Sequence, residues 1–351
     1  MKVMVYRIGS LGDTIIALPA FNAIRRQFQR DEIVLLTSRH KDCRVHAQDV
    51  LDGSGLIDGV LVYDGSKKGL ARPAEFFNLG RRIRAMGIQR LYYLPPRLRS
   101  HAQAVRDHWY FRGWCGIPEV IGTEGVTRPR LRDAAGRFLR LEPEAAYLTG
   151  HLTRCGVDTQ EASRGLLERL VSRKEAGRVD MLFKQSAGRL YVAVGIGGKG
   201  TAQKWPVERY QALVKRLVAA RPEAEPVCFG GAGDWREAER LIAAAGRGRN
   251  FCGIFGVREG IEALRRCALY VGNDTGTMHM AALAGIRCVV VSSARANPGV
   301  WEPLGAGHRV LRKTVPCEGC ELRDCDVPGH PCMEDISVEE VLKAVTGELV
   351  P

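Results

Sequence analysis

The sequence predicts an α/β protein with two doubly wound halves, and three observations lead to this fold class. Short apolar runs alternate with segments of helical periodicity along most of the 351 residues. A glycine-rich turn follows the first apolar run of each half, at residues 9–13 and 195–200, where open parallel sheets bind their ligands. The length suits two domains. We therefore expect an N-terminal domain over residues 1–180 and a C-terminal domain over residues 181–351, facing each other across a cleft.

In the first half, the apolar runs predict parallel strands separated by helices. Residues 2–8 form the first expected strand, and the turn at residues 9–13 leads into a helix that reaches Phe28. Residues 123–141 hold several arginines and few apolar residues, which predicts an exposed loop, either a solvated face or a substrate-binding segment. Further strands are expected at 32–37, 59–63, 90–94 and 119–122, and helices around 41–51, around 74–86 and along the segment 99–112.

The second half repeats this alternation after helices and a connector at residues 143–187. Apolar runs predict its strands, and amphipathic segments predict the helices between them. The expected strands are 189–195, 225–230, 249–252, 268–272 and 287–292, and the expected helices are 207–221, 234–245, 260–267, 276–284 and 337–346.

Charge and cysteine usage limit the partners and the compartment. The formal net charge is +13, and residues 1–188 hold 31 Lys and Arg against 20 Asp and Glu, whereas the rest of the chain holds 21 against 19. A basic first half fits a phosphorylated lipid, an anionic membrane surface or nucleic acid, and it also fits a merely soluble surface. We find no apolar run of membrane-spanning length and no signal peptide. The eleven cysteines, an odd number, predict reduced thiols in a cytoplasmic protein.

Another glycine-containing turn of the second half lies between the strand expected at 268–272 and the helix expected at 276–284. Its sequence is Gly-Asn-Asp-Thr-Gly-Thr-Met-His, from Gly272 to His279. Asp274, Thr275 and Gly276 stand where the helix begins, so its first backbone N–H groups are available for an anion. The alternative is an ordinary helix cap with a close-packing glycine.

Two further turns of the second half suit a nucleotide. Residues 195–206 combine four glycines with Lys199 and Lys204, which suits a diphosphate, although the segment is not a Walker loop. Asp234 follows two glycines after the next strand, where it either binds ribose hydroxyls or caps the following helix.

Taken together, these segments resemble the heptosyltransferase family, glycosyltransferase family nine, over nearly the whole chain. Each motif alone is weak, and their order and spacing make the set specific. The motifs are Arg7-Ile8-Gly9-Ser10-Leu11-Gly12-Asp13, Lys204-Trp205-Pro206, Gly230-Gly231, Asp274-Thr275-Gly276 with His279, Trp301-Glu302-Pro303-Leu304, and a cysteine-rich tail that ends in Cys332-Met333-Glu334-Asp335-Ile336.

The resemblance implies a GT-B fold of two Rossmann-like domains. It implies that the first domain binds a growing lipopolysaccharide core, an anionic glycolipid acceptor, and that the second binds an ADP-sugar, typically ADP-heptose. It further implies transfer with inversion and without a required metal cofactor. Asp13 matches the general base, and Asp234 falls where the family usually has a ribose-binding glutamate. The donor loop is matched by Asp274, Gly276 and His279.

One position departs from the family pattern. The phosphate-binding lysine usually lies two residues before the tryptophan of the Trp-Pro pair, where this chain has Gln203. Lys204 or Lys199 takes over that contact in our interpretation. The departure leaves the donor open, so a different nucleotide-sugar and acceptor, or a catalytically silent protein, are alternatives.

The residues themselves suggest how such a transfer would run. An acceptor hydroxyl must lose a proton, which a carboxylate such as Asp13 can take. A diphosphate must leave, and Lys199, Lys204, Thr275 and Gly276 can stabilise its charge. Asp274 would repel phosphate, so we expect it to bind sugar hydroxyls or to orient the loop. Arg7 and Gly12 are candidates for binding the acceptor, and Arg7 would either contact an acceptor phosphate or steady Asp13. For His279, a structural role is as good an interpretation as sugar binding.

The cysteine-rich segment at residues 317–332 is a candidate metal site. Cys317, Cys320, Cys325 and Cys332 place four thiols within sixteen residues. This spacing favours a structural zinc site over an iron–sulfur cluster. Together with the basic charge it also raises a function of a different class, a nucleic-acid-binding protein with a zinc-binding cluster, which would leave the glycine turns and Asp13 unexplained. For the transferase we expect a cytoplasmic location, peripheral on the inner membrane.

Overall fold

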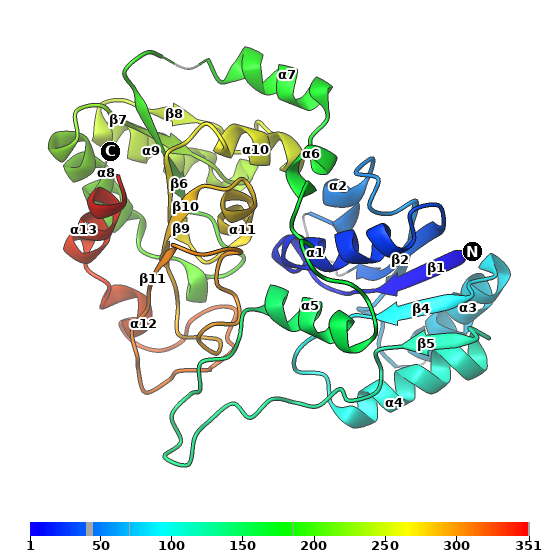
Figure 1. Ribbon diagram of the computed structural model, residues 1–351. Coiled ribbons are helices and arrows are strands. Elements are labelled where there is room, and N and C mark those ends of the chain that lie inside the picture. The colour runs from blue at the N-terminus through cyan, green and yellow to red at the C-terminus, as the bar shows by residue number, and fades with distance from the viewer. Residues whose placement is uncertain (40–44, 70, 185, 350–351) are drawn as a thin grey trace. The chain divides into compact units, whose positions relative to one another are not determined.

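The computed structural model describes residues 1–39, 45–69, 71–184 and 186–349 and divides into two compact units (Figure 1). The first unit contains residues 1–130 and 144–170, and the second contains residues 131–143 and 171–351. The sequence predicts a boundary at residue 180. The observed division instead assigns helix α7 (Arg173–Leu182) and the short segment 131–143 to the second unit.

A five-stranded, fully parallel sheet forms the centre of the first unit, in the order β3-β2-β1-β4-β5. β1, the first strand in sequence, is central, because apolar residues on both of its faces are buried. The chain therefore reverses its winding direction at β1, and such a reversal opens a crevice at the carboxyl ends of the strands. The strands are β1 (Lys2–Tyr6), β2 (Glu32–Arg39), β3 (Gly59–Asp64), β4 (Arg90–Tyr93) and β5 (Glu119–Ile121).

Helices connect and cover the strands of this sheet. α1 is the most buried of them, because every residue from Thr14 to Arg25 is buried. Its Asp13 stands at position N3 and closes a capping box that begins at the N-cap residue Ser10. The helices are α1 (Leu11–Gln27), α2 (Ala47–Leu51), α3 (Ala71–Met86), α4 (His101–Trp109), the π-helical turn η1 (Tyr110–Trp114), α5 (Glu144–Arg154) and α6 (Leu166–Leu170).

The second unit has a six-stranded parallel sheet in the order β11-β10-β9-β6-β7-β8. Its winding reverses between β6 and β9, so the turns after these two strands lie side by side. The strands are β6 (Leu190–Gly195), β7 (Ala224–Cys228), β8 (Arg249–Asn250), β9 (Leu269–Asn273), β10 (Arg287–Val291) and β11 (Arg309–Leu311).

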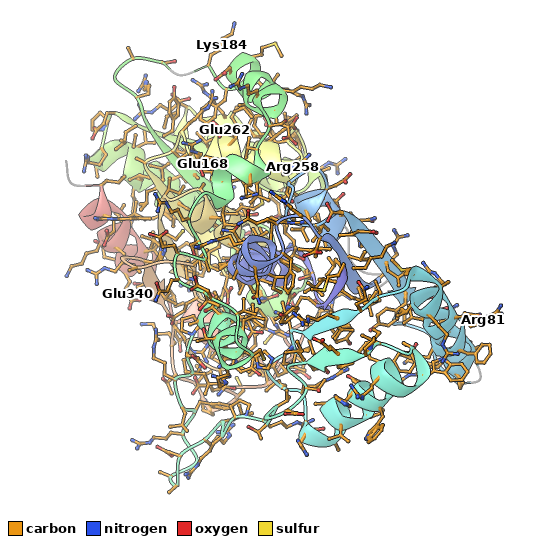
Figure 2. All side chains as sticks on the ribbon, turned by 45° about the vertical axis from the view of Figure 1, so that its right-hand side comes forward. Arg81, Glu168, Lys184, Arg258, Glu262 and Glu340 are labelled. Atoms are coloured by element: carbon orange, nitrogen blue, oxygen red, sulfur yellow. The ribbon has the colours of Figure 1, made fainter. Side chains whose placement is uncertain are left out.

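Several helices of the second unit form an apolar core with this sheet, which Tyr210, Leu213 and Met333 help to fill. The N-terminal cap of α13 is local, because Ser337 and Glu340 each accept a hydrogen bond from the other's backbone N–H group. Glu340, which is labelled in Figure 2, also forms an ion pair with Lys313. The helical elements after α7 are η2 (Thr201–Gln203), α8 (Val207–Ala220), η3 (Ala232–Asp234), α9 (Trp235–Ala245), α10 (Val257–Leu264), α11 (Gly276–Leu283), α12 (Pro331–Glu334) and α13 (Val338–Glu348).

The arginine-rich segment 123–141 contains no helix, in agreement with the sequence, but its second part is anchored. Asn297 Nδ2 donates to Leu131 O (3.2 Å), and Leu141 N donates to Pro298 O (2.9 Å). A backbone bridge between Arg132 and Phe138 closes the segment into a small hairpin. Residues 131–143 are therefore part of the second unit rather than a free loop.

The ten cysteines in the described ranges are all free thiols. Among the described helices, none combines the length and the apolar character that crossing a bilayer requires.

Candidate functional site

Asp13 lies at the carboxyl edge of the first sheet, in the turn between β1 and α1. Its Oδ2 accepts hydrogen bonds from Ser10 N (2.7 Å) and Ser10 Oγ (2.8 Å). Gly9, at φ 151°, leaves the space that this carboxylate fills, because a Cβ at Gly9 would lie 2.2 Å from Asp13 Cβ. Within the described residues, Oδ1 accepts no hydrogen bond, so one carboxylate oxygen is fixed and the other remains open to a ligand.

Arg7 is buried beneath this turn in an ion-pair network. Its Nη2 lies 3.1 Å from Glu144 Oε1, and Arg97 Nε lies 3.0 Å from the other oxygen of the same carboxylate. Only 4% of Arg7 and 2% of Glu144 are exposed. The structure therefore gives Arg7 a partner that the sequence did not indicate. Its role toward an acceptor, like that of Gly12 in the first turn of α1, stays a prediction.

A cavity of about 720 Å³ lies beside this turn, within the first unit. It extends along the carboxyl ends of β1, β2 and β3, and α3, α4 and η1 complete its wall. Tyr6 and Ile8 from β1 and the residues after it line the cavity, whereas Gly9 lines a small neighbouring pocket that shares Ser38 with it. The volume lies in the range of ligand-binding pockets.

The wall of this cavity is cationic and aromatic. Its cations are Lys67, Arg72, Arg99 and Arg106, its acids are Asp64 and Asp107, and its rings are Tyr6, Tyr63, Phe76, Tyr110 and Phe111.

Asp107 is the centre of the polar network in that wall. Its carboxylate pairs with Arg99 and with Arg106 (2.7 Å) and accepts a hydrogen bond from the Tyr93 hydroxyl (2.7 Å). Burial raises the pKa of Tyr93 well above its ordinary value, and the charge of Asp107 adds to this, so the hydroxyl stays protonated. Two guanidinium groups, those of Arg99 and Arg106, therefore offset the negative charge of Asp107. The remaining positive charge and the ring faces suit an anionic sugar-containing ligand.

In the second unit, the turn after β9 presents the start of α11. Thr275 is the N-cap of this eight-residue helix, and its side chain makes no capping bond. Gly276 and the residues that follow thus have N–H groups that the cap leaves available for an anion. Asn273, which the sequence analysis did not single out, ties this turn to the glycine-rich loop. Its Nδ2 donates to Ile196 O (2.9 Å) and Gly197 O (3.1 Å).

Asp274 lies in a pocket with two arginines that sequence reasoning missed, Arg295 and Arg312. Burial raises the pKa of the Asp274 carboxyl to about 7, although both arginines and a hydrogen bond from Ser292 lower it. The signal that could have revealed Arg295 is its place four residues after β10, at the carboxyl edge of the sheet. The free space in this pocket is about 30 Å³, which is much smaller than the volume of a typical ligand-binding pocket.

The glycine-rich loop after β6 carries Lys199 and Lys204, the residues predicted to bind phosphate, but neither side chain lines the Asp274 pocket. Gln203, not a lysine, lines the Asp274 pocket, and its Nε2 donates to Asp274 O (3.2 Å). Lys204 is half-buried and packs over Gly198, whereas Lys199 is exposed. The two lysines thus flank the pocket loop without lining the pocket, and their contact with a diphosphate remains a prediction.

Asp234 lies between two glycine-containing turns, the one that follows β6 and the one that follows β7. Its Oδ2 accepts a hydrogen bond from Gly231 N (2.9 Å), and a Cβ at Gly197 or Gly230 would lie 2.7 or 2.6 Å from the same oxygen. Both interpretations from the sequence remain compatible with this place, since the carboxylate caps the turn and also lies between the loops that follow β6 and β7. His279 is 3% exposed within α11 and does not line the Asp274 pocket.

The four cysteines predicted to bind metal are brought together. Cys317, Cys320, Cys325 and Cys332 line one small pocket of the second unit.

Comparisons with known proteins agree with this architecture. Lipopolysaccharide heptosyltransferase 2 of Escherichia coli (strain K12) is 27% identical over 288 residues, 78% of each chain. The fold matches that of a glycosyl transferase family 9 protein from Veillonella parvula (TM-score 0.69, 20% identity, 99% of this chain and 97% of that chain). It also matches E. coli ADP-heptose lps heptosyltransferase II (TM-score 0.63, 21% identity, 99% and 98%).

These similarities confirm the predicted GT-B fold and support the transferase rather than the nucleic-acid-binding alternative. The family model of glycosyltransferase family 9 (heptosyltransferase) matches residues 146–329, which is more than half of the sequence. The chain therefore belongs to glycosyltransferase family 9, the heptosyltransferases.

Proposed function

We propose that this glycosyltransferase moves a heptose from ADP-heptose to the core of a lipopolysaccharide acceptor, with inversion at the anomeric carbon. The family and the relatives that act on lipopolysaccharide support this substrate pair. The observation that carries the acceptor half is the Asp13 carboxylate, which is held through one oxygen beside a cationic, aromatic cavity.

In the proposed reaction, Asp13 Oδ1 takes the proton of the acceptor hydroxyl as the hydroxyl oxygen attacks the anomeric carbon. The bond between that carbon and the β-phosphate oxygen breaks, and ADP leaves with the electron pair. The N–H groups at the start of α11 and the guanidinium groups of Arg295 and Arg312 offset the charge that develops on the diphosphate. The products are the glycosylated acceptor, ADP and one proton.

The acceptor would be bound by the cavity of the first unit. Phosphate or carboxylate groups of a lipopolysaccharide core would contact Arg72 and Arg106, and sugar rings would stack on Phe76 and Tyr110. This assignment explains why the cations outnumber the acids among the described residues that line the cavity.

Asp13→Asn tests the proposed base. Asparagine keeps the shape and the acceptor atom for Ser10, so α1 stays capped, but it cannot take a proton. We expect turnover of ADP-heptose and a heptose-free core acceptor to fall by about 10²–10⁴-fold, while the affinity for ADP stays unchanged in calorimetry. Turnover is followed by mass spectrometry of the acceptor.

Ser10→Ala is the matched control, because it removes the Ser10 Oγ bond and leaves the carboxylate in place. Its turnover should remain within a few-fold of the parent. Near-normal turnover of Asp13→Asn would exclude Asp13 as the base. Titration with UDP, GDP and CMP beside ADP tests the donor, and preference for another nucleotide would replace ADP-heptose within the same mechanism.

We further infer a peripheral contact with an anionic bilayer, because a lipid-linked acceptor lies at such a surface. The helices that wall the cavity also carry exposed aromatic side chains, among which Trp109 is 67% exposed. Phe77 contacts Trp114 with 5.1 Å between ring centroids, and Arg84 lies over the Trp114 ring. Arg81 extends from α3 at the outer edge of the first unit (Figure 2). Aromatic rings beside arginines are typical of membrane-surface contacts.

A further inference from the structure

Asn273, the last residue of β9, is fully buried, and the hydrogen-bonding capacity of its side chain is completely used. Its Oδ1 accepts from Trp205 N (3.0 Å) and from the Tyr210 hydroxyl (2.9 Å). Its Nδ2 donates to Ile196 O (2.9 Å) and to Gly197 O (3.1 Å). A primary amide offers two acceptor positions on its oxygen and two N–H donors, so these four bonds satisfy all of them. The side chain therefore holds other parts of the protein and has no polar group left for a ligand.

The partners of this amide determine which way round it lies. A backbone N–H such as that of Trp205 can only donate, and backbone carbonyls such as those of Ile196 and Gly197 can only accept. The Tyr210 hydroxyl can do either, but burial raises its pKa well above the ordinary value, so it keeps its proton and donates to Oδ1. Exchanging the amide oxygen and nitrogen would place like groups against each other at three of the four contacts. The arrangement is therefore specific to asparagine in this one orientation.

These bonds join the two ends of the glycine-rich loop that follows β6. Ile196 and Gly197 open the loop and Trp205 closes it, so one side chain fixes both where the loop begins and where it ends. The segment between these ends carries both lysines that the sequence predicts to bind phosphate. The position of those lysines therefore depends on the amide of Asn273.

The backbone of Asn273 leads directly to the other part of the proposed diphosphate site, the start of α11. Asp274 follows it in the chain, and Thr275 is the N-cap of that helix. A further hydrogen bond spans the same two segments, since Gln203 Nε2 donates to Asp274 O (3.2 Å). The glycine-rich loop and the start of α11 thus meet at one buried amide and at one backbone carbonyl.

The residues that surround this amide are themselves held in a packed core. Trp205 is buried, its Nε1 donates to Ile336 O (3.0 Å), and its ring packs edge-on against Tyr210 with 4.8 Å between the centroids. Tyr270 is also buried, and its hydroxyl donates to Asn273 O (3.3 Å). Partners that are fixed by close packing keep their geometry when no ligand is bound, which is the condition for a preorganised site.

We propose that Asn273 is a positioning residue of the donor site, which sets the spacing between the lysines of the glycine-rich loop and the N–H groups at the start of α11. This inference rests on the proposed function, in which both segments contact the diphosphate of the donor. A shift of either segment separates groups that must reach one diphosphate together. Binding of the diphosphate and stabilisation of its leaving charge then both weaken.

Asn273→Asp tests this role with the smallest change in shape. Aspartate keeps an oxygen for Trp205 N, but it replaces the two N–H groups by an oxygen that meets Ile196 O and Gly197 O. The end of the loop stays held while its beginning is released. We expect the Kd for ADP, measured by calorimetry, to rise by roughly tenfold or more. Asn273→Ala should raise it at least as much, and because this variant is neutral, it separates lost positioning from added charge.

Asn22→Asp is the matched control. Asn22 is another buried asparagine, on α1 of the first unit, and its Nδ2 likewise donates to two backbone carbonyls, those of Ala162 (2.9 Å) and Arg164 (3.0 Å). This variant should lower the thermal midpoint of unfolding, as Asn273→Asp does. Its Kd for ADP should stay within about twofold of the parent's, because the substitution lies in the other compact unit.

A double-mutant cycle with Lys204→Ala distinguishes positioning from a general loss of stability. In the parent, Lys204→Ala should weaken ADP binding. In the Asn273→Ala background the lysine is already displaced, so the same substitution should weaken ADP binding by a factor about threefold smaller. Losses that multiply independently, or no loss from Lys204→Ala in the parent, would overturn an action of Asn273 through this loop.

Tyr210→Phe keeps the inference testable if both Asn273 variants fail to fold. It removes one of the four bonds and keeps the ring, so ADP binding should weaken a few-fold, and an unchanged Kd would overturn the inference. Folded Asn273 variants that bind ADP as tightly as the parent would overturn it as well, while the proposed function would stand. A parent protein without affinity for ADP would overturn the proposed donor and this inference together.

Discussion

The carboxyl group of Asp274 titrates near neutral pH because it is buried, and Arg295 and Arg312 limit that rise. Glu302, in the same pocket, raises it slightly further. Below pH 7 the group is mostly neutral, and above pH 7 it is mostly negative. Because its folded pKa lies above the usual value of 3.8, its contribution to folding stability is present at low pH and is lost as pH rises through 7.

From this we predict that ADP binds more tightly at pH 6 than at pH 8. A negative Asp274 repels the diphosphate that α11 and the two arginines attract, so the difference should be about tenfold, or ~1.4 kcal/mol. Calorimetry at both pH values measures it. Asp274→Asn stays neutral throughout and corrects for the ionisation of ADP itself. A parent protein with the same pH dependence as this variant would contradict the prediction.

At the level of residues, the sequence could predict those that stand in strand–turn–helix motifs. Asp13 and Asp274 are examples, because each follows an apolar strand directly and the topology then carries it to the ligand edge. Arg295 and Arg312 could not be predicted in the same way. Each lies in an irregular segment, and only the folded loop between β10 and α12 brings them to Asp274.

Helix α5 begins with a buried charge that holds two strand-end loops in place. Glu144 accepts from Arg7 and from Arg97, and Arg97 also lies over the ring of Tyr147, 4.5 Å from its centroid. Removing the carboxylate would leave two nearly buried guanidinium groups facing each other.

We predict that Glu144→Ala lowers the free energy of unfolding by about 3–5 kcal/mol, the usual cost of stranding a buried charge. Urea unfolding followed by circular dichroism measures this. Glu168→Ala, at an exposed position of α6 (Figure 2), is the control and should change stability by less than about 0.5 kcal/mol. If Glu144→Ala lowered the free energy of unfolding as little as the control does, solvent would have to reach the guanidinium groups of Arg7 and Arg97, which would contradict the prediction.

Among the elements, long periodic segments could be predicted and short ones could not. The strands of both sheets and most helices lie within a few residues of the expected ranges, because their apolar residues are buried on both sides of the sheets. β11 has only three residues and α12 only four, so neither shows a recognisable period. Both depend on tertiary contacts that are distant in sequence.

For the whole molecule, the excess of positive charge predicts how it meets a bilayer. The chain has a formal charge of +13, most of it in the first half, and the exposed rings of α3, α4 and η1 belong to that half. We predict binding to vesicles that contain phosphatidylglycerol, with weaker binding as sodium chloride rises from 50 to 500 mM, since salt screens the attraction. Sedimentation with vesicles measures it.

Trp109→Ala should weaken this binding several-fold, whereas Trp235→Ala, an exposed tryptophan on α9 of the second unit, should not. Equal binding to vesicles of neutral phosphatidylcholine, or equal loss from the two variants, would argue against a bilayer contact at α4.

The chain passes between the two units three times, because residues 131–143 belong to the second unit while the segments on either side belong to the first. This arrangement has a consequence for synthesis on the ribosome. The segment emerges long before residues 297–302, to which it binds through Leu141 and Arg140. At about 5–20 residues per second, the delay is roughly 8–30 s. During that interval the hairpin has no docking surface, so the nascent first unit is open to chaperones in the cell before the second unit exists.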